Sequence, residues 1–436
     1  MIRPAPLMLA AALALAGPAF ASPDLAGRIA AGRIAVISDG DFVAASYANG
    51  RLAPLEAGHR DLLTILTRRG TEIVRGSLPI SNSVTAAPEI LRLSPDGRTA
   101  FVTERLGGRE PGDMTARDLP TGTRLFAVDL DDPAQPRLAD TAQVAGFPEG
   151  LALSPDGRRV AVVSNPAEGS FVQIVDYAGG RFGPVARFDL AVLGVTGDAP
   201  GPRGGVTATN VQWHPSGRFL AVNVNTQNRV AFFEVSGDGL RPWGAPVAVG
   251  ADPFVGRFTP DGRHYLTSDW GRDFAAANLD GRIPERRSTI SVLRLAEDGR
   301  HAVVDRAETD FSAEGLAVSP DGRLVATVNM RGTLFPPGSP RFHRQASVSL
   351  LALDPATGGL TKLGDYPFEG VLPEGGSFDL TGEHFLATVF QGHEGAGPEA
   401  GPGLAVFRVV KGERPSLDPL GRIALPHGVH HVDLAR

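Results

Sequence analysis

Four glutamates recur at equivalent positions of an internal repeat, and this shared register makes them a candidate site. They are Glu89, Glu149, Glu314 and Glu374. Each stands five residues before the first residue of a recurring turn, at the head of an expected strand. His427 occupies the same register near the C-terminus, and the two remaining repeats place Thr209 and Phe254 there. Carboxylates that are crowded together raise one another's pKa or recruit a cation.

Two kinds of chemistry fit this set. Carboxylate and amide oxygens suit Ca²⁺, whereas an added histidine favours Zn²⁺ or Mn²⁺. We therefore predict a divalent cation held by the four glutamates, with Glu314, Glu374 and His427 as the catalytic groups. The residues leave a structural alternative open, in which each glutamate bonds backbone N–H groups where a strand begins. The chain has no cysteine, so thiolate ligands and covalent c-type haem are excluded.

Arginines supply a candidate anion site. Arg331, Arg341 and Arg344 lie in segment 331–345, which contains no acidic residue. A guanidinium group matches the geometry of a carboxylate or phosphate. We predict that these three residues, together with Asn210, bind a small anionic ligand. A second group, within segment 271–287, mixes arginines with acidic residues. The alternative is that arginine is simply the common base of this chain, because 40 of its 42 basic residues are Arg.

A turn repeat predicts the elements that position these residues. Ser94-Pro95-Asp96-Gly97-Arg98 recurs five times, in full or in variant form. Its glycine falls at Gly97, Gly157, Gly217, Gly262, Gly322 and Gly382. Pro presets φ, Asp bonds its own backbone and Gly supplies a positive φ, as hairpin turns require. Apolar, β-branched stretches flank each turn. Four strands in each repeating unit indicate an all-β protein, a β-propeller of four-stranded blades.

The two ends of the chain supply a seventh blade. Segment 33–39 is a strand candidate, followed by two more at 62–66 and 71–78, and the missing inner strand is 429–434. We therefore predict seven blades, closed by pairing of the N-terminal and C-terminal strands; the alternative is six blades with an N-terminal extension. The turns share one face. The long segments share the other, and we expect the site at that mouth of the central channel.

After the turns come stretches such as Phe101-Val102-Thr103-Glu104 and Ala326-Thr327-Val328-Asn329. These resemble the Tyr-Val-Thr-Asn repeat of surface-layer proteins and of lactonase-like propellers, a superfamily that includes 6-phosphogluconolactonase and muconate-cycloisomerase-like members. The resemblance implies a propeller fold and favours a hydrolase or isomerase of small lactones. The lactonases carry an Arg-His pair at the inner-strand entry, which this chain replaces by Glu-Gly or Glu-Ile. A non-catalytic scaffold that binds a protein or ligand is the alternative, and a redox propeller is a third interpretation.

The N-terminus has the pattern of a secretory signal peptide. Arg3 precedes an apolar stretch at 7–16, and Ala19-Phe20-Ala21 is a small-x-small cleavage site. We predict removal of residues 1–21, a single propeller domain at 22–436, and a periplasmic or secreted location. The net charge of −6 argues against nucleic acid as a partner. No membrane span is expected, and we expect a monomer, with a protein partner left open.

Overall fold

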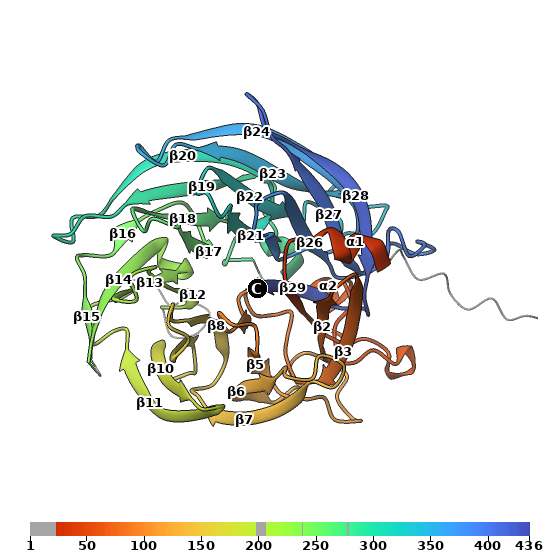
Figure 1. Ribbon diagram of the computed structural model, residues 1–436, viewed down its shortest axis with the longest axis horizontal. Coiled ribbons are helices and arrows are strands. Elements are labelled where there is room, and N and C mark those ends of the chain that lie inside the picture. The colour runs from red at the N-terminus through yellow and green to blue at the C-terminus, as the bar shows by residue number, and fades with distance from the viewer. Residues whose placement is uncertain (1–22, 198–205, 238, 277–278) are drawn as a thin grey trace, which may run out of the picture.

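The computed structural model describes residues 23–197, 206–237, 239–276 and 279–436. The predicted signal peptide at 1–21 lies outside these residues. Within them, seven antiparallel sheets of four strands form a ring, with one outermost strand split in two. Figure 1 looks down the axis of this ring, with the first strand of each sheet at the centre and the last at the rim. The prediction of a seven-bladed β-propeller is confirmed.

Each sheet runs from an inner strand at the channel to an outer strand at the rim. In that order, the first contains β29 (Val429–Ala435), β1 (Arg33–Ser38), β2 (Leu62–Arg69) and β3 (Glu72–Pro79). The next two contain β4 (Leu91–Leu93), β5 (Thr99–Leu106), β6 (Thr121–Asp129) and β7 (Arg137–Gln143), then β8 (Pro148–Leu153), β9 (Arg159–Ser164), β10 (Phe171–Ala178) and β11 (Arg181–Asp189). The fourth contains β12 (Ala208–Trp213), β13 (Phe219–Val224), β14 (Arg229–Ser236) and the split edge β15 (Gly239–Pro242) and β16 (Val247–Ala248).

The remaining three sheets complete the ring. The fifth contains β17 (Pro253–Phe258), β18 (His264–Asp269), β19 (Arg287–Arg294) and β20 (Ala302–Phe311). The sixth contains β21 (Ala313–Val318), β22 (Leu324–Asn329), β23 (Gln345–Leu353) and β24 (Leu360–Glu369). The seventh contains β25 (Gly376–Phe378), β26 (His384–Val389), β27 (Gly403–Val410) and β28 (Ser416–Ala424). Short helices lie outside the sheets: α1 (Pro23–Arg28), α2 (Ser46–Asn49), α3 (Leu279–Arg282), and the 3₁₀ turns η1 (Leu55–Ala57) and η2 (Asn225–Gln227).

The C-terminal strand closes the ring. β29 pairs antiparallel with β1, from Arg33 opposite Ala435 to Ser38 opposite Val429. The last residues of the chain therefore form the inner strand of the sheet that its first strand begins. This pairing confirms the predicted closure and rules out the six-bladed alternative. Because both chain ends share one sheet, the inner edge of β1 is paired rather than left open.

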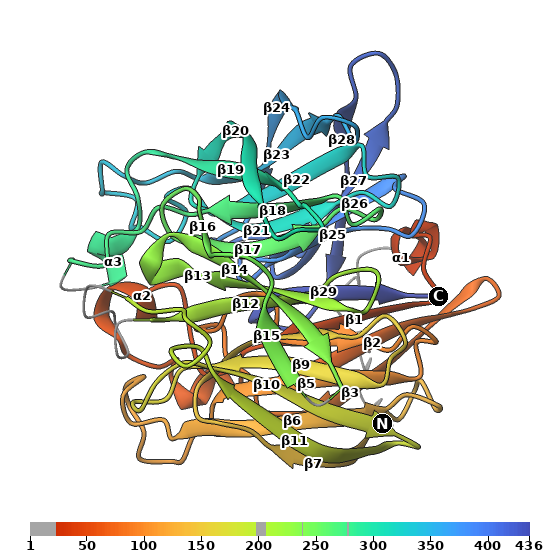
Figure 2. The same ribbon diagram turned by 90° about the vertical axis from the view of Figure 1, so that its left-hand side faces the viewer.

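The six turn glycines adopt the left-handed conformation that the repeat predicted, with φ between 68° and 72°. Successive turns also pack on one another, because Pro95 of one turn lies against Gly157 of the next. The C-terminal residue Arg436 contacts Gly97, which places the chain end on the turn face. Figure 2 shows that end on one side of the ring and α2 and α3 on the other. Tight turns and longer loops therefore occupy opposite faces.

The core lies between adjacent blades. Apolar side chains from neighbouring sheets interdigitate there, as Val163 and Val172 do with Leu220 and Phe233. All four are buried. Each sheet is thus buried on both faces, and the inner strands are held rigidly around the channel. Among the described residues, none of the helices combines the length and the apolarity that crossing a membrane would need.

Candidate active site at the channel mouth

A cavity of about 280 Å³ opens at the channel mouth on the loop face. Its walls come from the inner strands β8, β12, β17 and β21 and from the loops above them. The residues that line it include Phe42, Tyr47, Arg105, Glu149, Thr207, Thr209, Asn225, Phe254, Trp270, Arg272, Phe274, Arg282, Ile283 and Glu314. Four of the seven residues that the repeat register singled out are among them: Glu149, Thr209, Phe254 and Glu314.

A β-bulge aims each of these four side chains into the cavity. In β21, Ala313 pairs with Asn329 and Gly315 with Val328, so Glu314 is an extra residue with no partner of its own across the ladder. The same shift leaves Glu149, Thr209 and Phe254 as the extra residues of their strands. Bulges bend a strand and redirect a side chain, and they are frequent beside active sites. The four residues share one position in the repeat because each is the extra residue of the same β-bulge in its own strand.

Residues with a left-handed backbone conformation, and a glycine, accompany these β-bulges. The residue two positions before Glu149, Phe254, Glu314 and Glu374 has φ between 53° and 58°, although none of the four is glycine. These residues are Phe147, Asp252, Ser312 and Leu372. The glycine that follows Glu314 serves a close approach between blades, because a Cβ on Gly315 would lie 2.2 Å from the carbonyl oxygen of Glu374. The glycine of this Glu-Gly pair therefore has a structural role, because it allows two neighbouring blades to approach closely.

Glu314 is the most chemically distinctive group in the cavity. Its side chain is buried, and among the described residues its Oε2 atom has no hydrogen-bond partner. Burial raises the pKa of Glu314 to about 8, and the nearby Arg272 opposes that rise. A carboxyl group whose pKa lies near neutrality can both accept and donate a proton under physiological conditions, as general acid–base catalysis requires.

Arg272 is held rigidly beside Glu314. It forms a two-pronged ion pair with the buried Asp252, with Nε 2.7 Å from Oδ2 and Nη2 3.1 Å from Oδ1. Its guanidinium carbon also lies 4.5 Å from the ring centre of Phe254 and 4.1 Å from that of Trp270. An arginine that is fixed by an aspartate and by aromatic rings presents its remaining N–H groups in one orientation.

Glu374 lies behind the cavity wall rather than in it. The hydroxyl of Tyr47 donates a hydrogen bond to its Oε1 at 3.2 Å, and Tyr47 itself lines the cavity. Its Oε2 lies 3.9 Å from Nδ1 of His430. Burial, followed by the charge of Glu314, raises the pKa of Glu374 well above its usual value. The two glutamates thus form a buried, mutually repelling pair on adjacent blades.

The other two glutamates are neutralised by arginines. Oε1 of Glu149 lies 2.9 Å from Nε of Arg105. Glu89 is ion-paired with both Arg92 and Arg257. Because each carboxylate has its own counter-ion, these two residues do not create the excess of negative charge that a cation would relieve.

The predicted cation ligands do not cluster. Among the described residues, the one group of three acidic side chains whose oxygens lie within 4.8 Å of one another is Asp39, Asp41 and Asp61. None of the four glutamates belongs to it. The divalent cation therefore stays a prediction, and acid–base chemistry at Glu314 does not require one.

His427 is engaged elsewhere. Its Nε2 donates to the carbonyl oxygen of Phe42 at 2.8 Å, and its ring stacks on His59 with centroids 3.7 Å apart. Burial lowers the pKa of His427 to about 4, so the imidazole is neutral at physiological pH. His427 does not line the channel-mouth cavity.

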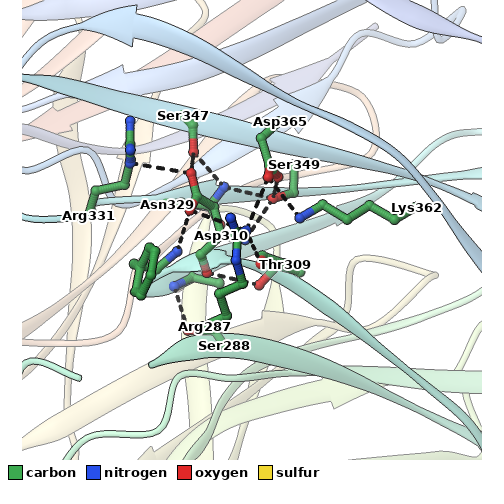
Figure 3. Close-up of polar contacts among 12 residues, drawn as sticks. Arg287, Ser288, Thr309, Asp310, Asn329, Arg331, Ser347, Ser349, Lys362 and Asp365 are labelled. Carbon is green, nitrogen blue, oxygen red and sulfur yellow. Dashed lines mark hydrogen bonds and ion pairs between the residues drawn. The ribbon is translucent and has the colours of Figure 1, made fainter. Parts of the chain in front are cut away.

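The predicted anion-binding arginines lie away from the channel mouth. Figure 3 shows Arg331 turned towards the buried Asp310, with Nε 3.3 Å from Oδ2, while Ser347 donates to the same oxygen at 2.7 Å. Arg341 pairs with Glu285 and Arg344 with Glu369, each at 3.3 Å. Arg331 and Arg341 line a neighbouring cavity of about 370 Å³.

The arginines at the channel mouth are instead Arg105, Arg272 and Arg282. The last two belong to segment 271–287, whose arginines are visible in the sequence, but Tyr47 and Trp270 belong to no sequence pattern that predicts them. Asn210 lies in β12 beside the bulge and is fully buried; its Oδ1 accepts from the hydroxyl of Tyr265 at 3.3 Å.

Unpartnered polar atoms gather at this cavity. Within the described part of the chain, five lining side chains carry a buried polar atom that has no hydrogen-bond partner. One of them, Arg105 Nε, is ion-paired with Glu149, and the other four are Thr207 Oγ1, Asn225 Oδ1, Trp270 Nε1 and Glu314 Oε2. Buried polar atoms are normally bonded, so several orphans around one concave surface indicate a ligand that would satisfy them.

Comparison with known proteins supports the fold. No protein-family model and no curated protein sequence matches the chain. Solved structures do match. The periplasmic gluconolactonase of Pseudomonas aeruginosa superposes with a TM-score of 0.62 at 17% identity, over 93% of this chain and 99% of that one. A candidate 6-phosphogluconolactonase from Bacteroides uniformis gives 0.61 at 16% identity, over 93% and 100%.

A third neighbour, a candidate 6-phosphogluconolactonase from Bacteroides fragilis, gives a TM-score of 0.60 at 15% identity, over 93% of this chain and 98% of that one. The resemblance to lactonase-like propellers is thus confirmed for the fold. At these identities the likeness does not extend to the reaction.

Proposed function

We propose that this protein is a hydrolase that opens the lactone ring of a small anionic substrate in the channel-mouth cavity. The observation that carries the proposal is Glu314, a buried carboxyl group with one unpartnered oxygen and a pKa raised to about 8, facing a concave site of ligand size. The lactonases named among the structural neighbours favour this reaction class over other hydrolyses.

The chemistry follows from the residues present. Ionised Glu314 accepts a proton from a water molecule while the water oxygen attacks the lactone carbonyl carbon. The resulting oxyanion needs hydrogen-bond donors; the lining residues Trp270 and Thr207 each carry one, the indole N–H and the hydroxyl, that has no partner among the described residues. When the ring C–O bond breaks, the leaving alkoxide takes the proton back from Glu314. The product is an open hydroxy acid, and no cofactor is consumed.

The substitution Glu314→Gln tests this role. It keeps the size of the side chain but removes the proton acceptor, so kcat on a reactive lactone should fall by roughly 10²- to 10⁴-fold. Glu234→Gln, at a surface ion pair with Arg241, is the matched control and should keep full activity. A Glu314→Gln enzyme that stays within twofold of the parent would overturn the proposal.

The pH dependence is a second readout of the same proposal. Because the ionised form of Glu314 is the base, kcat should rise with pH through about 8, after subtraction of the spontaneous hydrolysis of the lactone. A flat profile between pH 6 and 9 would contradict the assignment.

We also propose that the protein works outside the cytoplasm. The segment Arg3 to Ala21 has the pattern of a secretory leader, and one of the structural neighbours is named as a periplasmic enzyme. Sequencing the N-terminus of protein purified from the periplasm should give Ser22 as the first residue. Retention of Met1 on fully active cytoplasmic protein would contradict export.

A further inference from the structure

Several aromatic side chains line the channel-mouth cavity. Phe42, Tyr47, Phe254, Trp270 and Phe274 all line it. Ring surfaces favour the flat or apolar body of a ligand through contact area and desolvation. A polyhydroxylated sugar lactone, by contrast, needs a hydrogen-bond partner for each hydroxyl group that it loses from water. Several polar groups of the lining are already engaged within the protein: the hydroxyls of Ser46, Thr85 and Thr209 each take part in an internal hydrogen bond.

The charges of the cavity nearly cancel, and what remains is positive. Arg105 is neutralised by Glu149, and Arg272 by Asp252. Arg282 also lines the cavity, and among the described residues no carboxylate pairs with it; its Nε donates to the carbonyl oxygen of Ala276 at 3.3 Å. Of the lining arginines that the structure describes, Arg282 is therefore the one whose charge no ion pair offsets.

The unpartnered atoms define the polar part of the ligand. Trp270 Nε1 is a donor, Thr207 Oγ1 can donate or accept, and Asn225 Oδ1 is an acceptor. These few groups would fix one carbonyl and one or two further polar atoms. They do not form the continuous polar wall that a sugar acid would require.

From these three observations we propose that the preferred substrate is an aromatic or alkyl lactone that carries a single carboxylate, rather than a polyhydroxylated sugar lactone. The apolar body lies against the aromatic walls, and the carboxylate lies at Arg282. This inference rests on the proposed function, which it narrows to one substrate class.

Three lactones test separately whether the substrate needs an apolar body and whether it needs a carboxylate. Phthalide-3-acetate has an aromatic body and one carboxylate, phthalide has the same body without the charge, and glucaro-1,4-lactone has the charge on a hydroxylated body. We expect kcat/KM for phthalide-3-acetate to exceed that for each of the others by about tenfold or more, since one charge-assisted contact and one apolar body each contribute a factor of that order. Binding of the same three compounds to the Glu314→Gln enzyme is measured by calorimetry.

Two arginine variants test whether the carboxylate of the substrate binds at Arg282. Arg282→Gln should weaken the binding of phthalide-3-acetate by about tenfold and leave that of phthalide unchanged. Arg98→Gln is the matched control, because it removes the same charge at an exposed ion pair with Asp131, within the turn face. Equal weakening of both ligands by Arg282→Gln would place the carboxylate elsewhere and overturn that assignment.

The outcomes distinguish the inference from the function on which it rests. If glucaro-1,4-lactone is turned over as well as phthalide-3-acetate or better, the substrate class is wrong and the hydrolase stands. If no lactone is turned over but binding follows the expected order, the hydrolase is wrong and the ligand class stands. If none of the three binds, both are overturned.

Discussion

The hydroxyl of Tyr47 donates a hydrogen bond at 3.2 Å to Oε1 of Glu374, and so connects two blades at the closure of the ring. Tyr47 belongs to α2, after the first strand, whereas Glu374 precedes the inner strand of the last sheet. Burial and the carboxylates of Glu374 and Glu314 raise the pKa of Tyr47 well above its usual value, so the phenol remains a donor throughout the accessible pH range. This contact forms the boundary between the cavity and the buried glutamate behind it.

Removing the Tyr47 hydroxyl should lower the stability of the protein and change the pKa of Glu374. Tyr47→Phe leaves the buried carboxyl without this donor, and we expect the free energy of unfolding to fall by about 1–2 kcal/mol. The pKa of Glu374 should also rise, because the lost bond lowers it. Chemical denaturation at pH 7 measures the first effect. Tyr177→Phe, whose hydroxyl lies 3.4 Å from Thr99 and outside the cavity, is the control and should change stability less.

Stability should depend on pH through Glu314. Its pKa is raised to about 8 in the folded protein, from an unfolded value near 4.5. Between these values the folded state holds more protons than the unfolded state, so the free energy of unfolding must fall as pH rises from 4.5 to 8. Glu314→Gln cannot ionise, so its stability relative to the parent should increase across the same window. Parallel curves for the two proteins in urea would show that the pKa of Glu314 is not raised.

The close approach at Gly315 should not tolerate a methyl group. A Cβ there would lie 2.2 Å from the carbonyl oxygen of Glu374. Gly315 lies in β21 and Glu374 lies two residues before β25, and these two inner strands cannot easily separate. Gly315→Ala should therefore destabilise the protein by about 1–3 kcal/mol. Gly108→Ala is the control, because a Cβ at Gly108 meets nothing within 4 Å. Similar midpoints for the two variants would mean that the blades can shift apart.

The role of Arg331 can be separated from ligand binding. Because it pairs with the buried Asp310, Arg331→Gln should lower the midpoint of thermal unfolding and leave KM for any lactone unchanged. A rise in KM without loss of stability would return Arg331 to the ligand-binding role that its position in an acid-free loop predicted.

The closing strand makes a prediction for the whole ring. Deleting residues 429–436 removes β29 and leaves β1 unpaired on its inner side. The truncated chain should lose its cooperative unfolding transition, because the first sheet can no longer complete the ring. A synthetic peptide of residues 429–436 should restore part of that transition when added in excess. An unchanged midpoint after truncation would contradict the closure as the source of stability.

The architecture could be read from the sequence because the features that encode it are local and repeated. Each Pro-Asp-Gly turn needs a positive φ at its glycine, and the structure has it at all six. The two chain ends could be assigned to one blade because the N-terminal segment has three strand candidates and lacks an inner strand, which the C-terminal segment 429–434 supplies. The repeat register also singled out Glu149 and Glu314, since bulges recur with the repeat.

What each glutamate faces was decided only by the tertiary structure. The register is the same for Glu89, Glu149, Glu314 and Glu374, yet their surroundings differ. The first two are paired with arginines. The last two are buried, each with one oxygen that has no hydrogen-bond partner, and only Glu374 accepts a hydrogen bond from Tyr47. These differences arise from loops and from neighbouring blades whose contacts are distant in sequence. A repeat determines where a side chain enters the channel, but its charge state and partners depend on which non-repeated residues fold over it.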